Sequence, residues 1–190
     1  MEARGGWILF RLFLVCLLVF AVAGCATKYV VPSGTGTALV RFQAEGLGPN
    51  NNAHFYLVTP GPDCKKHGVQ QLAKLGAEWG NKRLSDVRMI GSTGQPDRLR
   101  YEREVEAGQS LRLVASWIPA FNPYELHYNV LYAGLVELEA GKQYEVGFDL
   151  RADRRGIRVQ ELSETNGEIS RRDQLVRPVR VRKASDLCDL

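Results

Sequence analysis

The chain has 190 residues, of which 25 are basic, 21 acidic and 45% hydrophobic, and its formal net charge is +4. This weak positive charge excludes a nucleic-acid-binding protein that relies on charge, because such proteins concentrate basic side chains much more strongly. The length fits a single domain with a substantial hydrophobic core.

The first 24 residues have the layout of a secretory signal. Arg4 and Arg11 precede an uncharged apolar run over residues 12–22, and two small residues follow it. A run of roughly ten residues is too short to span a bilayer, which needs about 20. The sequence therefore predicts a leader, residues 1–24, that is cleaved from the mature chain.

The residues at the end of this leader, Val-Ala-Gly-Cys at 22–25, resemble the lipobox of bacterial lipoproteins. The resemblance implies that the Cys25 thiol carries diacylglycerol and that Cys25 becomes the first mature residue. Two or more acyl chains hold a protein stably on a membrane. Ala26, not aspartate, follows the cysteine, and by the sorting rule of this family that implies the periplasmic face of the outer membrane. The alternative is an unmodified cysteine close to an ordinary cleavage site.

Two thiols remain once Cys16 leaves with the leader and Cys25 is lipidated. Cys64 and Cys188 are expected to form a disulfide in an oxidising periplasm. Closing so long a loop is worth about 4 to 5 kcal/mol in the chain-entropy model. The alternative is a zinc site, since Cys64 and His67 have ligand-like spacing. No second ligand pair lies nearby in the sequence, so no metal is expected.

The mature chain is predicted to divide into a lipidated tether, residues 25–38, and a β domain, residues 39–190. Gly, Ser, Thr and Pro without an apolar period are typical of a tether. Period-two alternation, which indicates strands, recurs near residues 40–44, 54–58, 99–101, 111–117, 126–132, 143–150, 157–160 and 179–182. Val69, Leu72, Leu75 and Trp79 fall at helical spacing and predict one short helix, a turn or an irregular loop after the second strand.

These short strands and turn-length connections predict an all-β fold, an antiparallel β-sandwich of immunoglobulin-like or transthyretin-like kind. A closed barrel is the alternative. Two similar segments, around Glu-Ala-Gly at 106–108 and 139–141, each end one strand and begin another, so Gly108 and Gly141 are expected to adopt positive φ. Pro178 predicts an edge strand.

Several segments add a family resemblance. They are Pro-Asp-Cys at 62–64, Ala-Gly-Lys-Gln-Tyr-Glu-Val at 140–146 and Arg-Val-Gln-Glu-Leu at 158–162. Together with the lipobox, they resemble small, uncharacterised envelope lipoproteins of proteobacteria. The resemblance implies a lipid-anchored envelope protein and brings no activity with it.

No catalytic constellation or cofactor motif is recognisable, so the chain is expected not to be an enzyme. A Gly-x-Ser-x-Gly turn is absent from the sequence, and the histidines stand in no known motif. The alternative is an envelope-polymer hydrolase with an unfamiliar site. It would place His54 or His127 in a pocket beside a carboxylate such as Glu125 or Asp149.

A proline-flanked loop at 118–124 is the strongest indication of a binding surface. Phe121, Asn122 and Tyr124 form its tip, where exposed aromatic rings can stack on a sugar or dock a protein. The competing interpretation is that the flanking aromatics Trp117, Tyr128 and Tyr132 belong to the core. The expected function is therefore a non-enzymatic binding or structural role toward another envelope protein or glycan.

Residues 151–183 hold ten basic and five acidic side chains. Gathered on one face, these arginines would attach the domain to anionic lipid or cell wall. The competing interpretation is that they are solvated strand residues.

Overall fold

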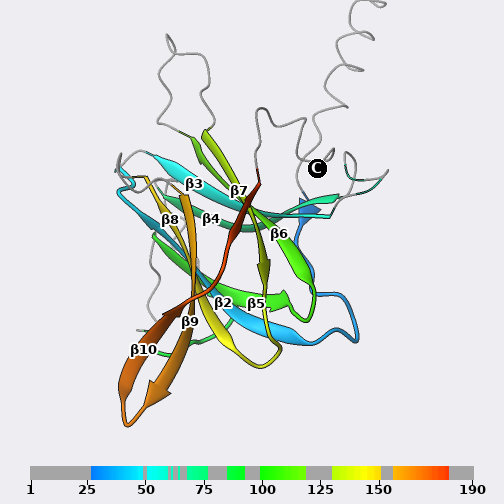
Figure 1. The fold of residues 1–190 in the computed structure, drawn as a ribbon. Coiled ribbons are helices and arrows are strands. Elements are labelled where there is room, and N and C mark those ends of the chain that lie inside the picture. Colours follow the sequence, from blue (N-terminus) through cyan, green and yellow to red (C-terminus); the bar gives the residue numbers. More distant parts are fainter. Residues whose placement is uncertain are drawn as a thin grey trace, which may run out of the picture.

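The computed structural model describes residues 27–48, 51–59, 61, 64, 68–76, 85–92, 99–118, 130–150 and 156–179. Within these ranges the chain is built from strands in two sheets that pack as a sandwich (Figure 1). The prediction of an all-β sandwich is confirmed, and the barrel alternative is wrong because the two sheets are separate.

One sheet has six strands in the order β1-β4-β3-β6-β7-β11. Their bounds are β1 Thr27–Lys28, β3 Asn52–Val58, β4 Val69–Gly76, β6 Ser110–Ile118, β7 Val130–Glu137 and β11 Arg177–Val179. All neighbours are antiparallel except β1 and β4, which are parallel. Pro178 lies in β11 at one edge, as its missing N–H predicts.

The second sheet has five strands in the order β10-β9-β8-β2-β5. Their bounds are β2 Thr37–Glu45, β5 Arg100–Glu106, β8 Gln143–Asp149, β9 Gly156–Thr165 and β10 Glu168–Asp173. The central pair, β2 and β8, is parallel, and the other pairs are antiparallel.

Apolar residues at alternate strand positions fill the space between the sheets. The ring of Phe55, from β3, lies 5.1 Å from the ring of Phe42 and 6.2 Å from that of Phe148, both in the opposite sheet. All three are at most 2% exposed, and burying each such ring contributes about 1.5 to 3 kcal/mol. The period-two pattern in the sequence therefore identified the faces that form the core.

The prediction of a helix or turn over residues 69–79 is wrong for residues 69–76, which form strand β4. Its pairing with β3 shifts register, since Phe55 pairs with Ala73 but Tyr56 pairs with Gln71. The extra residue, Leu72, is a β-bulge that interrupts the alternation. Apolar residues three apart, Val69, Leu72 and Leu75, therefore resemble a helical pattern while lying in a strand.

Residues 27–29 were expected in the tether but belong to the folded domain. Thr27 and Lys28 pair with Gln70 and Gln71 of β4. Tyr29 is 2% exposed and lies in the core cluster. Its hydroxyl accepts a hydrogen bond of 2.8 Å from the Glu106 amide. The folded part therefore begins no later than Thr27.

The glycine turns form as expected, with φ of 84° at Gly108 and 79° at Gly141. Strand β10 was not among the expected strands. It follows β9 through a tight turn at Asn166 and Gly167, whose φ values of 54° and 79° have the sign that type I′ hairpin turns require. The β9–β10 hairpin reaches away from the sandwich body at the lower left of Figure 1.

Gly76, the last residue of β4, sits where no side chain fits. Its φ is +124°, and a Cβ there would lie 2.1 Å from the backbone oxygen of Asn51. We expect Gly76→Ala to destabilise the fold by more than about 2 kcal/mol in a urea titration, since strain and backbone clash add. Gly34→Ala is the control: φ is +82° there, but the added Cβ meets nothing within 4 Å. An equal loss of unfolding free energy in the two variants would contradict a destabilising clash at Gly76.

Candidate functional site

Several predicted site residues lie outside the part of the chain that the structure describes. They are the lipidation site Cys25, the zinc alternative's His67, the loop residues Phe121, Asn122 and Tyr124, the hydrolase candidates Glu125 and His127, and Cys188. Cys64 is described: it is 3% exposed and packs with Val58, Val114 and Ala133 on the outer side of the six-stranded sheet. Its disulfide with Cys188 stays a prediction.

Of the histidine–carboxylate pairs that the hydrolase alternative allowed, the structure describes both members of one, His54 and Asp149, and these two do not come together. His54 alternates along β3 with the core residue Phe55, and Asp149 follows the core residue Phe148 along β8. Their side chains therefore point to the outer faces of different sheets. His54 is 8% exposed, and its Nδ1 lies 3.0 Å from the Tyr56 hydroxyl and 3.2 Å from Nε2 of Gln71.

Two of the aromatic residues that flank the predicted binding loop belong to the core. Trp117 and Tyr132 are partly buried and pack against the main cluster. The Tyr132 ring lies 5.6 Å from that of Phe148. These two rings therefore stabilise the sandwich and are not displayed for a ligand.

A buried cluster of charged residues lies on the outer face of the five-stranded sheet. Arg41 of β2 is 2% exposed, and Glu102 on the neighbouring strand β5 is 1% exposed. Nε and Nη2 of Arg41 lie 2.8 Å and 2.7 Å from Oε1 of Glu102. Both nitrogens contact the same carboxylate oxygen, which leaves Oε2 of Glu102 for another donor. Burial is unexpected here, because strand alternation assigns both residues to the face away from the core.

Residues 85–92, which we call the strap, explain this burial. The Glu102 amide donates to Oγ of Ser85 at 2.9 Å, and the Met89 amide donates to Oε2 of Glu102 at 3.3 Å. Nη2 of Arg41 donates to the Ile90 carbonyl at 2.6 Å. Met89 is itself 4% exposed. The strap thus covers the charged pair and gives each of its two side chains a backbone hydrogen-bond partner.

The strap continues across the sheet beyond Arg41. The Ile90 amide donates to Oε1 of Gln143, in β8, at 2.9 Å. A Cβ on Gly91 would lie 2.6 Å from Cδ1 of Ile169, in β10. The strap therefore touches β5, β2, β8 and β10 and joins strands across the width of the sheet.

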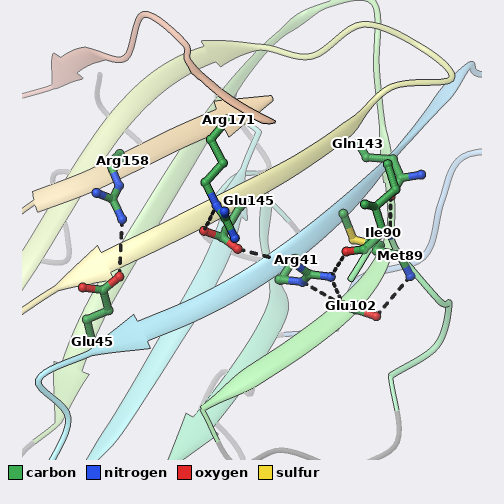
Figure 2. Close-up of polar contacts among 9 residues, drawn as sticks. All are labelled: Arg41, Glu45, Met89, Ile90, Glu102, Gln143, Glu145, Arg158 and Arg171. Carbon is green, nitrogen blue, oxygen red and sulfur yellow. Dashed lines mark hydrogen bonds and ion pairs between the residues drawn. The ribbon is translucent and has the colours of Figure 1, made fainter. Parts of the chain in front are cut away.

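Figure 2 shows that the charges continue in a row from the strap toward the exposed surface. Nη1 of Arg41 lies 3.6 Å from Oε2 of Glu145, whose Oε1 lies 3.6 Å from Nε of Arg171. Farther along the face, Arg158 pairs with Glu45 at 3.3 Å. The Arg41, Glu102, Glu145 and Arg171 set contains two positive and two negative charges, so its formal charge is zero.

A second cluster surrounds Glu161 of β9. One carboxylate oxygen accepts from Lys142 at 2.8 Å, and the other accepts from Arg172 and, at 3.2 Å, from Gln174. The hydrogen bond from Lys142, followed by that from Arg172, lowers the pKa of Glu161 below its ordinary value of 4.5.

This lowered pKa gives a pH-dependent contribution to stability. A carboxyl with a depressed folded-state pKa stabilises the fold above about 4.5 and loses that contribution as the pH falls through the folded value. We expect Glu161→Gln to be less stable than the parent at pH 7 and equal to it in strong acid. Urea titrations of both proteins across this range measure the difference, and a pH-independent gap would contradict it.

The basic residues of the last third do not collect on one face within the described ranges. Arg158 and Arg171 lie on the outer face with the charged cluster, whereas Arg172 alternates to the other side of β10 and Arg177 lies in the other sheet. Each lies within 4.0 Å of a glutamate. This arrangement favours the interpretation of strand residues in local ion pairs over a shared basic surface.

These contacts support structural roles for the charged side chains. The buried carboxylates Glu102, Glu145 and Glu161 each contact an arginine, and the strap supplies a further polar partner to Glu102. Among the described residues, no group of three histidine, cysteine, aspartate or glutamate side chains is placed to hold a metal ion. No helix in those same ranges is long and apolar enough to span a membrane. No protein-family model, curated protein or solved structure matches the chain.

Proposed function

We propose that this chain is a lipid-anchored envelope protein whose β-sandwich has a non-enzymatic binding or structural role toward another envelope protein or glycan. The observation that carries the proposal is the junction between the lipobox and the fold. Cys25 ends the lipobox motif, and Thr27 already pairs with Gln70 in the six-stranded sheet. A cleavable leader, a cysteine for lipid and a compact domain thus follow one another directly. On the motif's sorting rule, the protein is held at the periplasmic face of the outer membrane.

The described side chains give further support to a non-catalytic role. The buried acid groups Glu102 and Glu145 both contact Arg41, so their side chains are held in a fixed geometry. His54 and Asp149, the candidate base and acid, lie on different outer faces.

The proposal includes the Cys64–Cys188 disulfide, which suits an oxidising compartment. We expect no alkylation of either thiol in the denatured, unreduced protein, and labelling of both after reduction. Cys188→Ser should lower the free energy of unfolding by about 4 kcal/mol. Mass spectrometry of the alkylated peptides gives the measurement. Free Cys188 in protein taken directly from cells would remove the disulfide from the account.

Photo-crosslinking in intact cells tests the binding role. A photoreactive amino acid is placed singly at exposed positions such as Glu168, at the β10 edge, and Thr35, in the turn before β2. The proposal predicts a discrete adduct from at least one of a set of such exposed positions, lost when Cys25→Ala removes the protein from the membrane. If the photoreactive amino acid gives no adduct at any exposed position while the protein stays on the membrane, the proposed binding role is wrong.

A further inference from the structure

The start of the domain restricts how it can lie on a membrane. If Cys25 carries lipid, as the proposed function states, its Cα is only two residues from Thr27. Two residues span at most about 7 Å. Thr27 therefore cannot move far from the lipid head groups, whatever conformation Ala26 adopts.

Strand β1 is also firmly fixed to the rest of the domain. The Tyr29 amide donates to the Gln71 carbonyl at 3.2 Å, and the Tyr29 carbonyl accepts from Nη2 of Arg103 at 2.9 Å. The Arg103 guanidinium lies 4.8 Å from the centre of the Tyr29 ring. Releasing β1 to act as a flexible leash would expose this buried ring and break these bonds. The lipid is thus attached to an edge of the six-stranded sheet and not to a free arm.

The outward side of this edge has the side chains that a head-group region accepts. Lys28 and Val30 alternate with buried Tyr29 and are both exposed, and Val30, at 74%, is one of two large apolar side chains displayed by the described residues. A cation beside an apolar group suits the boundary between phosphate and acyl chains.

We propose that the β1–β4 edge rests on the phospholipid surface, with Lys28 and Val30 as contact residues. The β9–β10 hairpin then points away from the bilayer. Figure 1 shows the blue start of the ribbon at the upper right and the hairpin tip at the lower left, at opposite ends of the molecule. This orientation leaves the β10 edge accessible to a partner, while the β1–β4 edge is covered by lipid.

Fluorescence quenching of the full-length lipidated protein in phospholipid vesicles tests this orientation. A polarity-sensitive fluorophore is attached at Val30→Cys or, as the matched control, at exposed Glu168→Cys on the hairpin. Lipids with a nitroxide on the head group should quench the fluorophore at residue 30 several-fold more strongly than the one at residue 168. Insertion of about twelve Gly and Ser residues between Ala26 and Thr27, a flexible linker, should abolish most of this difference.

Flotation and intact mass of the same samples separate the two proposals. Protein that carries lipid and floats with vesicles, yet shows equal quenching at both positions, overturns the orientation and leaves the lipid anchor standing. Protein that acquires no lipid at Cys25 overturns the proposed anchor and the orientation with it. Strong quenching at residue 30 that survives the inserted linker would support the edge contact but overturn the short connection as its cause.

Discussion

Replacing Cys25 by alanine is expected to move nearly all of the protein from the membrane pellet to the soluble fraction of the cell envelope. In the proposed function the acyl chains on Cys25 provide the membrane affinity, and this substitution would remove all of them. One edge contact through Lys28 and Val30 is too small to replace them. Fractionation of cells, followed by immunoblotting after a carbonate wash, measures the redistribution.

Cys16→Ala is the matched control, because this cysteine lies within the apolar run of the predicted leader and the proposed cleavage would remove it. That variant should remain in the membrane pellet. If Cys25→Ala also remains there after the wash, the attachment does not depend on the lipidated cysteine, and an uncleaved leader would then account for it.

Replacing Arg41 by methionine is expected to cause the largest loss of stability among single charged positions of the sheet, about 3 to 5 kcal/mol. The substitution keeps much of the side-chain volume but leaves Glu102, which is 1% exposed, without its guanidinium partner. It also removes the donor that binds the Ile90 carbonyl. Urea denaturation of the mature chain, followed by circular dichroism, gives the free energy of unfolding.

Two further variants test whether burial of the pair is the cause. Arg158→Met removes an arginine whose side chain is 51% exposed and paired with Glu45, so its cost should stay within about 1 kcal/mol. Adding Glu102→Met to Arg41→Met should recover part of the stability, since no unpaired buried charge remains. A single Arg41→Met variant as stable as Arg158→Met would contradict the role assigned to the cluster.

The sequence was most informative where one strand face meets the core. Val40, Phe42 and Ala44 in β2, and Tyr144, Val146 and Phe148 in β8, alternate with polar residues, and all six are buried. Only that face is buried by the hydrophobic effect, so apolar residues recur at every second position of the strand and can be recognised in the sequence. The positive φ of Gly108 and Gly141 follows from turn chemistry in the same way.

Strands β4 and β10 could not be predicted by the same signal. The bulge at Leu72 places buried residues three apart in β4, which alternation does not anticipate. In β10 most side chains are exposed and only Ile169 is apolar, so the strand shows no alternation of apolar and polar residues. The turn residues Asn166 and Gly167 were the signal that a hairpin occupies this segment.

The charged cluster could not be predicted from the sequence for a different reason. Arg41, Glu102 and Glu145 occupy outward strand positions, where alternation predicts solvent. The burial of Arg41 and Glu102 depends on the strap, whose residues 85–92 have no periodicity and bind this pair through backbone groups of Met89 and Ile90. Backbone hydrogen bonds do not depend on residue type, so the sequence contains no direct mark of them.

Mass spectrometry of the N-terminal peptide from the membrane-bound protein shows how the mature chain begins. We expect it to begin at Cys25 and to carry a diacylglyceryl group on the Cys25 sulfur. A mature chain that begins at another residue, or one whose Cys25 is unmodified, would contradict a lipid-anchored domain.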